Sequence, residues 1–307
     1  MKERFTKEAS PLNGICIRQE SEDLMEKTIK EARNLLRLNH RLQYQPERVV
    51  SIVCSSRSGS TISKHALCLH PELCCLAGEE EPYYKLARNG YPWHESDWFT
   101  LANDPDYIRL LIANELLNHA NQHNRRVLQQ QQIEEPPFVY PMRCRRRPTL
   151  VLKTPQNCYR RGVIPQLYPH AKIVYVRINR YSCAVINGLM DGWNSGQFTA
   201  RKTPQGWWCF DMPPNWKWDT VFNMSVNQYR QSQKYLDAYQ PADWTMDFEE
   251  FTNDWIGQCK QVWKLLGLPD FTPRQKHLPV LGATEPPKQD RWRLRRPWLE
   301  EVVHERL

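Results

Sequence analysis

No stretch of this 307-residue chain is apolar over the roughly 18 residues that a membrane-spanning helix needs, which excludes an integral membrane protein built on such helices. We expect no export signal either, because MKERFTKEASPLNG at the N-terminus carries charges where a secretory signal has its apolar core. Internal repeats are absent, and the only low-complexity tract is QQQQ at 129–132. We therefore expect a cytoplasmic protein without a membrane span.

The 10 cysteines lack the spacings that redox motifs and zinc sites use, since no C-x-x-C pair and no metal-ligand pattern occurs. In a reducing compartment we expect most of them to be free thiols that are buried as small hydrophobic side chains. Adjacent Cys74 and Cys75 form the one pair that merits a redox test. We expect no metal cofactor.

What the chain does contain is a globular composition with an excess of positive charge. Hydrophobic residues make up 40% of the sequence and the formal net charge is +8. This length suits one large α/β domain, which we place at 46–307. Residues 1–45 are predicted to form a helical extension packed on it, because Met25, Ile29, Ala32 and Leu36 recur at helical spacing. The charge suits an anionic ligand and does not select among nucleotide, nucleic acid and acidic surface.

Short apolar segments alternate with helical patterns along the chain. Strands are predicted at 49–54, 149–153 and 172–176, and helices follow each of them near 61–69, 157–168 and 181–190. Buried strands that alternate with helices predict a central parallel sheet flanked by helices on both faces, which is an α/β fold. Outside this core we expect helices at 104–132, 221–239 and 249–266, a strand at 244–248 and a basic tail.

One segment between these units is rich in tryptophan. Residues 193–218 contain Gly, Pro and several of the 12 tryptophans, and we expect a long ordered loop there. Two interpretations stay open: a lid on the acceptor side of an active site, or a loop packed into the core.

The loop after the first strand has the composition of a phosphate-binding turn. It consists of Arg57, Ser58, Gly59, Ser60 and Thr61, and it joins a buried strand to a helix N-terminus, where backbone N–H groups and the helix dipole attract anions. An ordinary turn with a Ser or Thr cap is the structural alternative.

A P-loop kinase or NTPase motif does not fit this loop. The motif G-x-x-x-x-G-K-[ST], aligned on Gly59 and Thr61, places Cys54 at its first glycine and Ser60 at its lysine. Both diagnostic residues are therefore missing.

The sequence SSRSGST resembles the 5′-phosphosulfate loop of sulfotransferases that use 3′-phosphoadenosine 5′-phosphosulfate (PAPS), above all the R-S-G-[ST]-T form of tyrosylprotein and related bacterial enzymes. Further segments resemble motifs of this family in the same order along the chain. They are HPEL at 70–73 followed by GEEE at 78–81, LKTPQN at 152–157, YPHAKIVYVRINR at 168–180, FEEF at 248–251 followed by LLGLP at 265–269, and RW at 291–292. The resemblance implies a P-loop-like sulfotransferase fold, with PAPS bound at the carboxyl ends of the strands.

The same resemblance assigns roles to single residues. Arg57 and the loop residues after it hold the phosphosulfate, Lys153 neutralises the bridging oxygen, and Arg177 holds the 3′-phosphate. The second Glu of G-E-E is the general base, which corresponds to Glu80, with Glu79 and Glu81 as neighbouring alternatives. The motifs that begin at Phe248 and Arg291 add donor contacts.

The chain departs from the family at one position of the 3′-phosphate site. Val185 stands where the family has a Ser, and Ser182 or Asn187 is a possible substitute. His70 and His94 are alternative bases, because other sulfotransferase branches use His; a structural role suits His70 better.

The acceptor is predicted to be a small molecule with a hydroxyl or amine group, while a carbohydrate or protein acceptor stays open. The basic run RCRRR at 143–147 is expected to be a solvated face rather than a nucleic-acid site, since it lacks interleaved aromatics. The alternative functions are a non-enzymatic anion- or nucleotide-binding protein and a P-loop kinase-like phosphotransferase. The sequence indicates no oligomeric state.

Overall fold

The computed structural model divides into two compact units, residues 1–44 and 45–307. It describes only residues of the second unit, namely 46–76, 78–79, 109, 112, 149–159, 162–196, 200–203, 206–209, 220–238, 242–274, 276–278 and 291–307. The predicted N-terminal helix, most of the predicted helix at 104–132 and the basic run at 143–147 lie outside the described residues.

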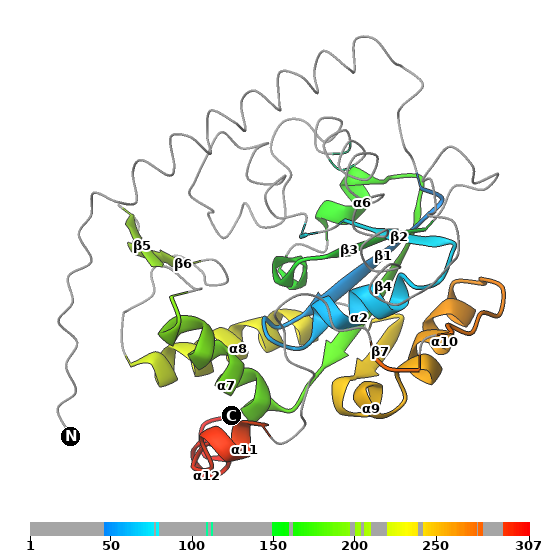
Figure 1. Ribbon diagram of the computed structural model, residues 1–307. Helices are drawn as coiled ribbons and strands as arrows, with labels where there is room; N and C mark the ends of the chain where they lie inside the picture. Colours follow the sequence, from blue (N-terminus) through cyan, green and yellow to red (C-terminus); the bar gives the residue numbers. More distant parts are fainter. Residues whose placement is uncertain are drawn as a thin grey trace. The chain divides into compact units, whose positions relative to one another are not determined.

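A five-stranded parallel sheet forms the centre of the second unit (Figure 1). Its strands are β1 (Arg48–Cys54), β2 (Leu73–Cys75), β3 (Thr149–Lys153), β4 (Lys172–Asn179) and β7 (Trp244–Asp247), in the order β2-β3-β1-β4-β7. The central strand β1 is flanked by β3 and β4, so that Ile52 lies opposite both Lys153 and Val176. The predicted parallel sheet is thus confirmed.

Helices cover both faces of this sheet. On one face α2 (Ser60–Leu67), α9 (Phe248–Asn253) and α10 (Trp255–Leu265) enclose the larger hydrophobic core with apolar side chains of β1, β4 and β7. On the other face α8 (Val221–Ala238) packs on β1 and on α7 (Ser182–Asn194). None of the described helices is long and apolar enough to cross a membrane.

The remaining elements are short. The 3-10 helix η3 (Pro155–Cys158) and helix α6 (Val163–Leu167) follow β3, and strands β5 (Ala200–Thr203) and β6 (Gly206–Cys209) form an antiparallel pair. Helices α11 (Arg291–Arg295) and α12 (Leu299–His304) close the chain. The basic tail of the sequence is therefore partly helical, with Trp292 and Leu299 packed against α7.

Three predicted segments differ from the structure. The helix expected at 249–266 is two helices, because Asp254 takes a non-helical conformation and caps α10 by accepting a hydrogen bond from the N–H of Gly257 at 2.9 Å. The helix expected at 157–168 is reduced to η3 and α6. The loop expected at 193–218 begins inside α7, where Trp193 is buried, and continues with β5 and β6.

The cysteine pair chosen from the sequence is not a pair in space. Cys74 and Cys75 are consecutive in β2, so their side chains point to opposite faces of the sheet. The Cys74 thiol lies 3.5 Å from the carbonyl oxygen of Thr149, whereas the Cys75 thiol interacts with Cys68 and His65. The hydrogen bond from Cys68, together with nearby Lys64, holds the pKa of Cys75 well below its usual value.

Candidate active site

The loop between β1 and α2 has the backbone of an anion-binding turn. Arg57 and Gly59 both have positive φ, at 68° and 87°, and the N–H of Ser58 donates to the carbonyl oxygen of Ser55 at 3.3 Å. Gly59 occupies the N-cap of α2 and supplies no side chain to the amide groups of the first turn. A left-handed conformation is rare for Arg, and such strain concentrates at functional sites.

Gly59 is also required by its surroundings. A β-carbon at this position would collide with the ring of Phe248, the first residue of α9. Phe248 is buried and stacks on Phe251. The predicted donor residue Phe248 therefore lies directly against the predicted phosphosulfate loop.

A lysine and a carboxylate meet beside this loop. Lys153, at the end of β3, is only 4% exposed and donates to the hydroxyl of Thr61 at 3.0 Å. It also forms an ion pair with Glu79, whose second carboxylate oxygen accepts a hydrogen bond from Thr154 at 3.4 Å. The structure thus brings together Thr61, Lys153 and Glu79, which are far apart in the sequence.

Lys64 binds the backbone just before Glu79, and the sequence analysis missed it. Its side chain is 2% exposed, and its ammonium donates to the carbonyl oxygens of Leu76 at 2.9 Å and Gly78 at 2.7 Å. A lysine in a helix is usually solvated, so only the small and apolar residues around it in α2 could have indicated burial.

Arg177 and Arg180, which form an R-x-x-R motif at the end of the segment YPHAKIVYVRINR, have different surroundings. The guanidinium of Arg177 donates from Nε to Asn179 at 2.8 Å, from Nη1 to Asp237 at 2.7 Å and from Nη2 to Gln233 at 2.9 Å. Arg180 instead donates to the carbonyl oxygen of Arg57 at 2.8 Å and lies over the Phe248 ring, 4.7 Å from its centre.

Arg180 thus contacts the predicted phosphosulfate loop itself, and the sequence analysis gave it no role. Burial lowers the pKa of Arg180, although nearby Glu249 partly offsets this. The motif R-x-x-R was the only signal of it in the sequence.

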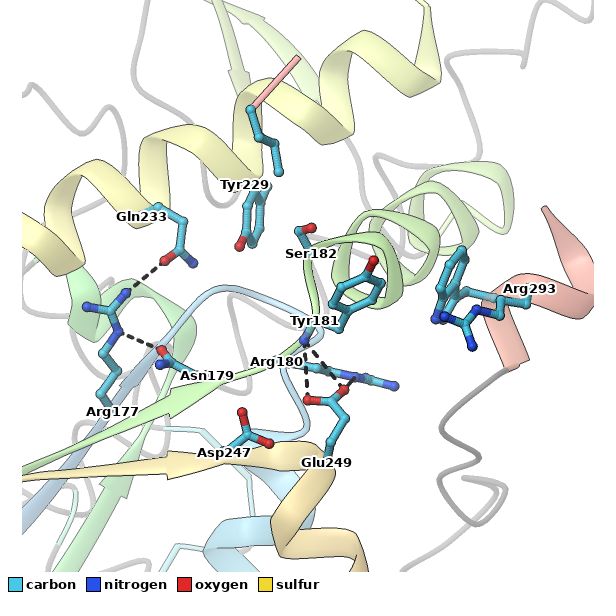
Figure 2. A pocket seen from close by; sticks show the side chains of 12 residues that line it. Arg177, Asn179, Arg180, Tyr181, Ser182, Tyr229, Gln233, Asp247, Glu249 and Arg293 are labelled. Carbon is cyan, nitrogen blue, oxygen red and sulfur yellow. Dashed lines mark hydrogen bonds and ion pairs between the residues drawn. The ribbon is translucent and has the colours of Figure 1, made fainter. Parts of the chain in front are cut away.

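A cavity of about 680 Å³ opens at the carboxyl ends of β4 and β7. Figure 2 shows Arg177 and Gln233 on one side of it, Arg180 and Glu249 below the start of α7, and Arg293 of α11 at the far side. Three arginines line this space together with Asp247 and Glu249, and Glu249 accepts from the N–H of Tyr181 at the start of α7, so the arginines supply the charge for an anion.

The residues that line the cavity show which side chain could take the place of the family Ser, whose position is Val185 in this chain. Ser182, at the start of α7, lines the cavity. Val185 is buried in the core, and Asn187 accepts a hydrogen bond from Arg296 and does not line the cavity. Near the C-terminus the lining residues are Trp292, Arg293 and Leu307, and the predicted Arg291 is not among them.

The histidine in the HP turn is engaged on both ring nitrogens. Nδ1 of His70 accepts from the N–H of Glu72 at 3.1 Å, so Nε2 carries the proton and donates to the carbonyl oxygen of Pro269 at 3.1 Å. Its ring also packs against Trp263 and Phe271. The other sequence candidates for a base, Glu80, Glu81 and His94, lie outside the described residues.

Several solved structures that are similar to this chain are sulfotransferases, and two others are described as a sugar kinase and a putative kinase. The sulfotransferase domain of an olefin synthase from Synechococcus PCC 7002 is 17% identical, with 86% of this chain and 96% of that chain covered and a TM-score of 0.44. A sulfotransferase from Alicyclobacillus acidocaldarius is 15% identical, with 86% and 97% covered and a TM-score of 0.41. For a sulfotransferase from Mycobacterium avium the identity is 11%, the coverage 89% and 81%, and the TM-score 0.44.

The search of curated proteins finds no match to this chain. A comparison with protein-family profiles, in contrast, matches residues 50–273 to the sulfotransferase family. This match spans more than half of the chain and includes the loop after β1, Lys153 and both arginines of the R-x-x-R motif. The chain belongs to the sulfotransferase family.

Proposed function

We propose that this protein transfers a sulfonyl group from PAPS to a hydroxyl or amine of a small-molecule acceptor. The observation that carries the proposal is the position of the Lys153 ammonium, 3.0 Å from the Thr61 hydroxyl in the loop that would hold the phosphosulfate. A buried cation at that point is suited to the negative charge that develops when the bond from sulfur to the bridging oxygen breaks.

The reaction is a single displacement at sulfur. The acceptor oxygen or nitrogen bonds to sulfur while the bond between sulfur and the bridging oxygen breaks. The acceptor proton passes to a carboxylate, and 3′-phosphoadenosine 5′-phosphate (PAP) leaves with its new negative charge beside Lys153. Catalysis thus requires a base, cations and an in-line arrangement.

The donor would extend from the loop after β1 to the cavity at β4. The hydroxyl and amide groups from Arg57 to Thr61 would bind the 5′-phosphosulfate. Arg177 and Ser182 would bind the 3′-phosphate, and Arg180 and Arg293 add positive charge to the same cavity. Arg291 does not line the cavity, so its assignment as a donor-binding residue rests on the family resemblance alone.

Glu80 is the proposed general base. Support comes from the family resemblance and from the contacts of the preceding residue, Glu79, with Lys153 and Thr154. Both oxygens of Glu79 already accept hydrogen bonds, which suits a residue that positions Lys153. The acceptor proton is therefore assigned to the next carboxylate, Glu80, which the family resemblance gives as the base.

Ligand-induced stabilisation tests the donor. PAP at about 100 times its dissociation constant adds roughly 2.7 kcal/mol of stability, a rise of about 5–10 °C in Tm for a domain of this size. ATP should stabilise the protein much less. Equal stabilisation by ATP, or none by PAP, would return the kinase-like or non-enzymatic interpretation to first place.

The acceptor class requires a separate experiment. A panel of small hydroxyl and amine compounds, incubated with enzyme and PAPS labelled in the sulfonyl group, should yield a labelled product. Glycans and tyrosine peptides belong in the same panel. Label transfer only to a glycan or peptide would overturn the small-molecule assignment and leave the reaction class intact.

A further inference from the structure

One amide side chain connects the two ends of the proposed donor site. Gln233, on α8, accepts a hydrogen bond from Nη2 of Arg177 at 2.9 Å and donates from its own amide nitrogen to the hydroxyl of Ser55 at 2.9 Å. Arg177 belongs to the cavity at β4, whereas Ser55 is the first residue after β1 and begins the phosphosulfate loop. Figure 2 shows Gln233 and Arg177 facing each other.

The donor and the acceptor can be assigned for each hydrogen bond that links Arg177, Gln233, Ser55 and Ser232. Arginine can only donate, so the amide oxygen of Gln233 must face Arg177 and its nitrogen must face Ser55. The hydroxyl of Ser232 donates to the carbonyl oxygen of Tyr229 at 2.7 Å, so the short contact between Ser55 and Ser232 is a bond that Ser55 donates. The amide cannot flip without losing both of its bonds.

The partners of Arg177 differ in how easily they can be displaced. Asp237 is 65% exposed, and an ion pair of that kind contributes little to stability, so a bound phosphate could replace it at small cost. Gln233 is only partly exposed and lies on a helix that packs on β1. Binding of a phosphate to Arg177 would therefore leave the bond to Gln233 in place and restrict the positions that both side chains can occupy.

We propose that Gln233 is a positioning residue that couples 3′-phosphate binding at Arg177 to the conformation of the phosphosulfate loop at Ser55. This inference rests on the proposed function, since it takes PAPS as the donor. Its consequence is that the 3′-phosphate contributes to turnover as well as to affinity. Removal of Gln233 should make the two ends of the donor site independent.

The first test compares Gln233→Met with Gln231→Met, a matched control two positions away on α8. In the wild type, adenosine 5′-phosphosulfate should have a lower kcat than PAPS in addition to a higher KM. In Gln233→Met the kcat values for the two donors should become equal within about twofold, while the control keeps the wild-type difference. A kcat difference that survives in Gln233→Met would overturn the coupling.

The second test is a set of mutant cycles on Arg177→Ala and Ser55→Ala. With Gln233 present, the loss of kcat/KM in the double variant should differ from the product of the two single losses by about threefold or more, as for residues that share a partner. In the Gln233→Met background the effects should multiply. Effects that multiply in both backgrounds would show that Gln233 supports the fold only.

A second variant covers the case in which Gln233→Met does not fold. Gln233→Leu is helix-compatible and can neither accept from Arg177 nor bond to Ser55, so it should also make the two effects multiply. Persistent non-multiplying effects in a folded Gln233→Leu protein would contradict the proposal. Failure of the proposed function would differ from all these outcomes, because the wild type would then neither bind PAP nor use PAPS.

Discussion

The two ends of the proposed donor site are built differently. At the end of β3, Lys153 is almost fully buried and is already engaged by Thr61 and Glu79, and buried Lys64 fixes the segment that carries Glu79. At the end of β4, the arginines line an open cavity, and Arg177 is held partly by an exposed aspartate.

This difference indicates that the two ends have different roles in the proposed reaction. Buried and fully engaged groups cost little reorganisation during a reaction, which suits the end where bonds would break. Exchangeable surface partners suit the end where a nucleotide must enter and leave. Substitutions at the β3 end should therefore act mainly on turnover, and those at the β4 end mainly on donor affinity.

Glu80→Gln should produce the largest effect. Loss of the general base should lower kcat by roughly 10²–10⁴-fold and leave PAP affinity nearly unchanged, because a base acts in the transition state. Steady-state kinetics and calorimetry measure the two quantities, with Glu81→Gln as the matched control. If Glu79→Gln abolished activity while Glu80→Gln remained near wild type, the base assignment would move by one residue.

Lys153→Ala should have the next largest effect. Removal of the cation beside the leaving oxygen should reduce kcat by about 10²–10³-fold, a loss similar to that of one oxyanion donor. Donor affinity should fall as well, since the same ammonium would contact the bound phosphosulfate. Exposed Lys234 supplies the control, and Lys234→Ala should match the wild type. A loss of affinity with unchanged kcat would remove the contrast between the two ends.

Arg177→Ala should act mainly on binding, with a smaller loss of kcat through the coupling at Gln233. Loss of a charge-assisted contact to the 3′-phosphate should weaken PAP by about 1.5–3 kcal/mol in calorimetry. Adenosine 5′-phosphosulfate lacks that phosphate, so its affinity should hardly change. Equal losses for both nucleotides would indicate that Arg177 supports the fold instead.

Arg180→Ala, in contrast, should weaken the binding of both nucleotides, because Arg180 contacts the loop at Arg57.

Gly59→Ala should have the smallest direct effect on catalysis, because it removes no charged or hydrogen-bonding side chain and acts on the scaffold that both ends of the site share. The left-handed conformation costs a residue with a β-carbon about 1–2 kcal/mol, and the collision with Phe248 adds to this. Thermal unfolding should show a lower Tm, and PAP binding should weaken. An unchanged Tm would mean that the loop relaxes around Phe248. Gly196→Ala is a useful control, since it has positive φ and no neighbour within 4 Å.

The parallel sheet and the loop between β1 and α2 could be predicted from local sequence. Continuous apolar strands such as β1 and β3 are typical of strands buried on both faces, and RSGST occupies the turn that such a fold uses for anions. The break at Asp254 could not be predicted, because a cap residue inside a helical pattern ends a helix only when the backbone geometry allows it. β2 was missed, since three residues carry too little periodicity.

By itself, the sequence determined which chemical groups were proposed for the site: the loop, Lys153, the GEEE segment and the R-x-x-R motif. Only the tertiary structure decided which of them meet. It joined Lys153 to Glu79, placed Ser182 rather than Asn187 at the cavity, and set Gln233 between Arg177 and Ser55. The physical reason is that motifs and periodicity record local preferences, whereas contacts between side chains far apart in sequence depend on how helices pack against the sheet.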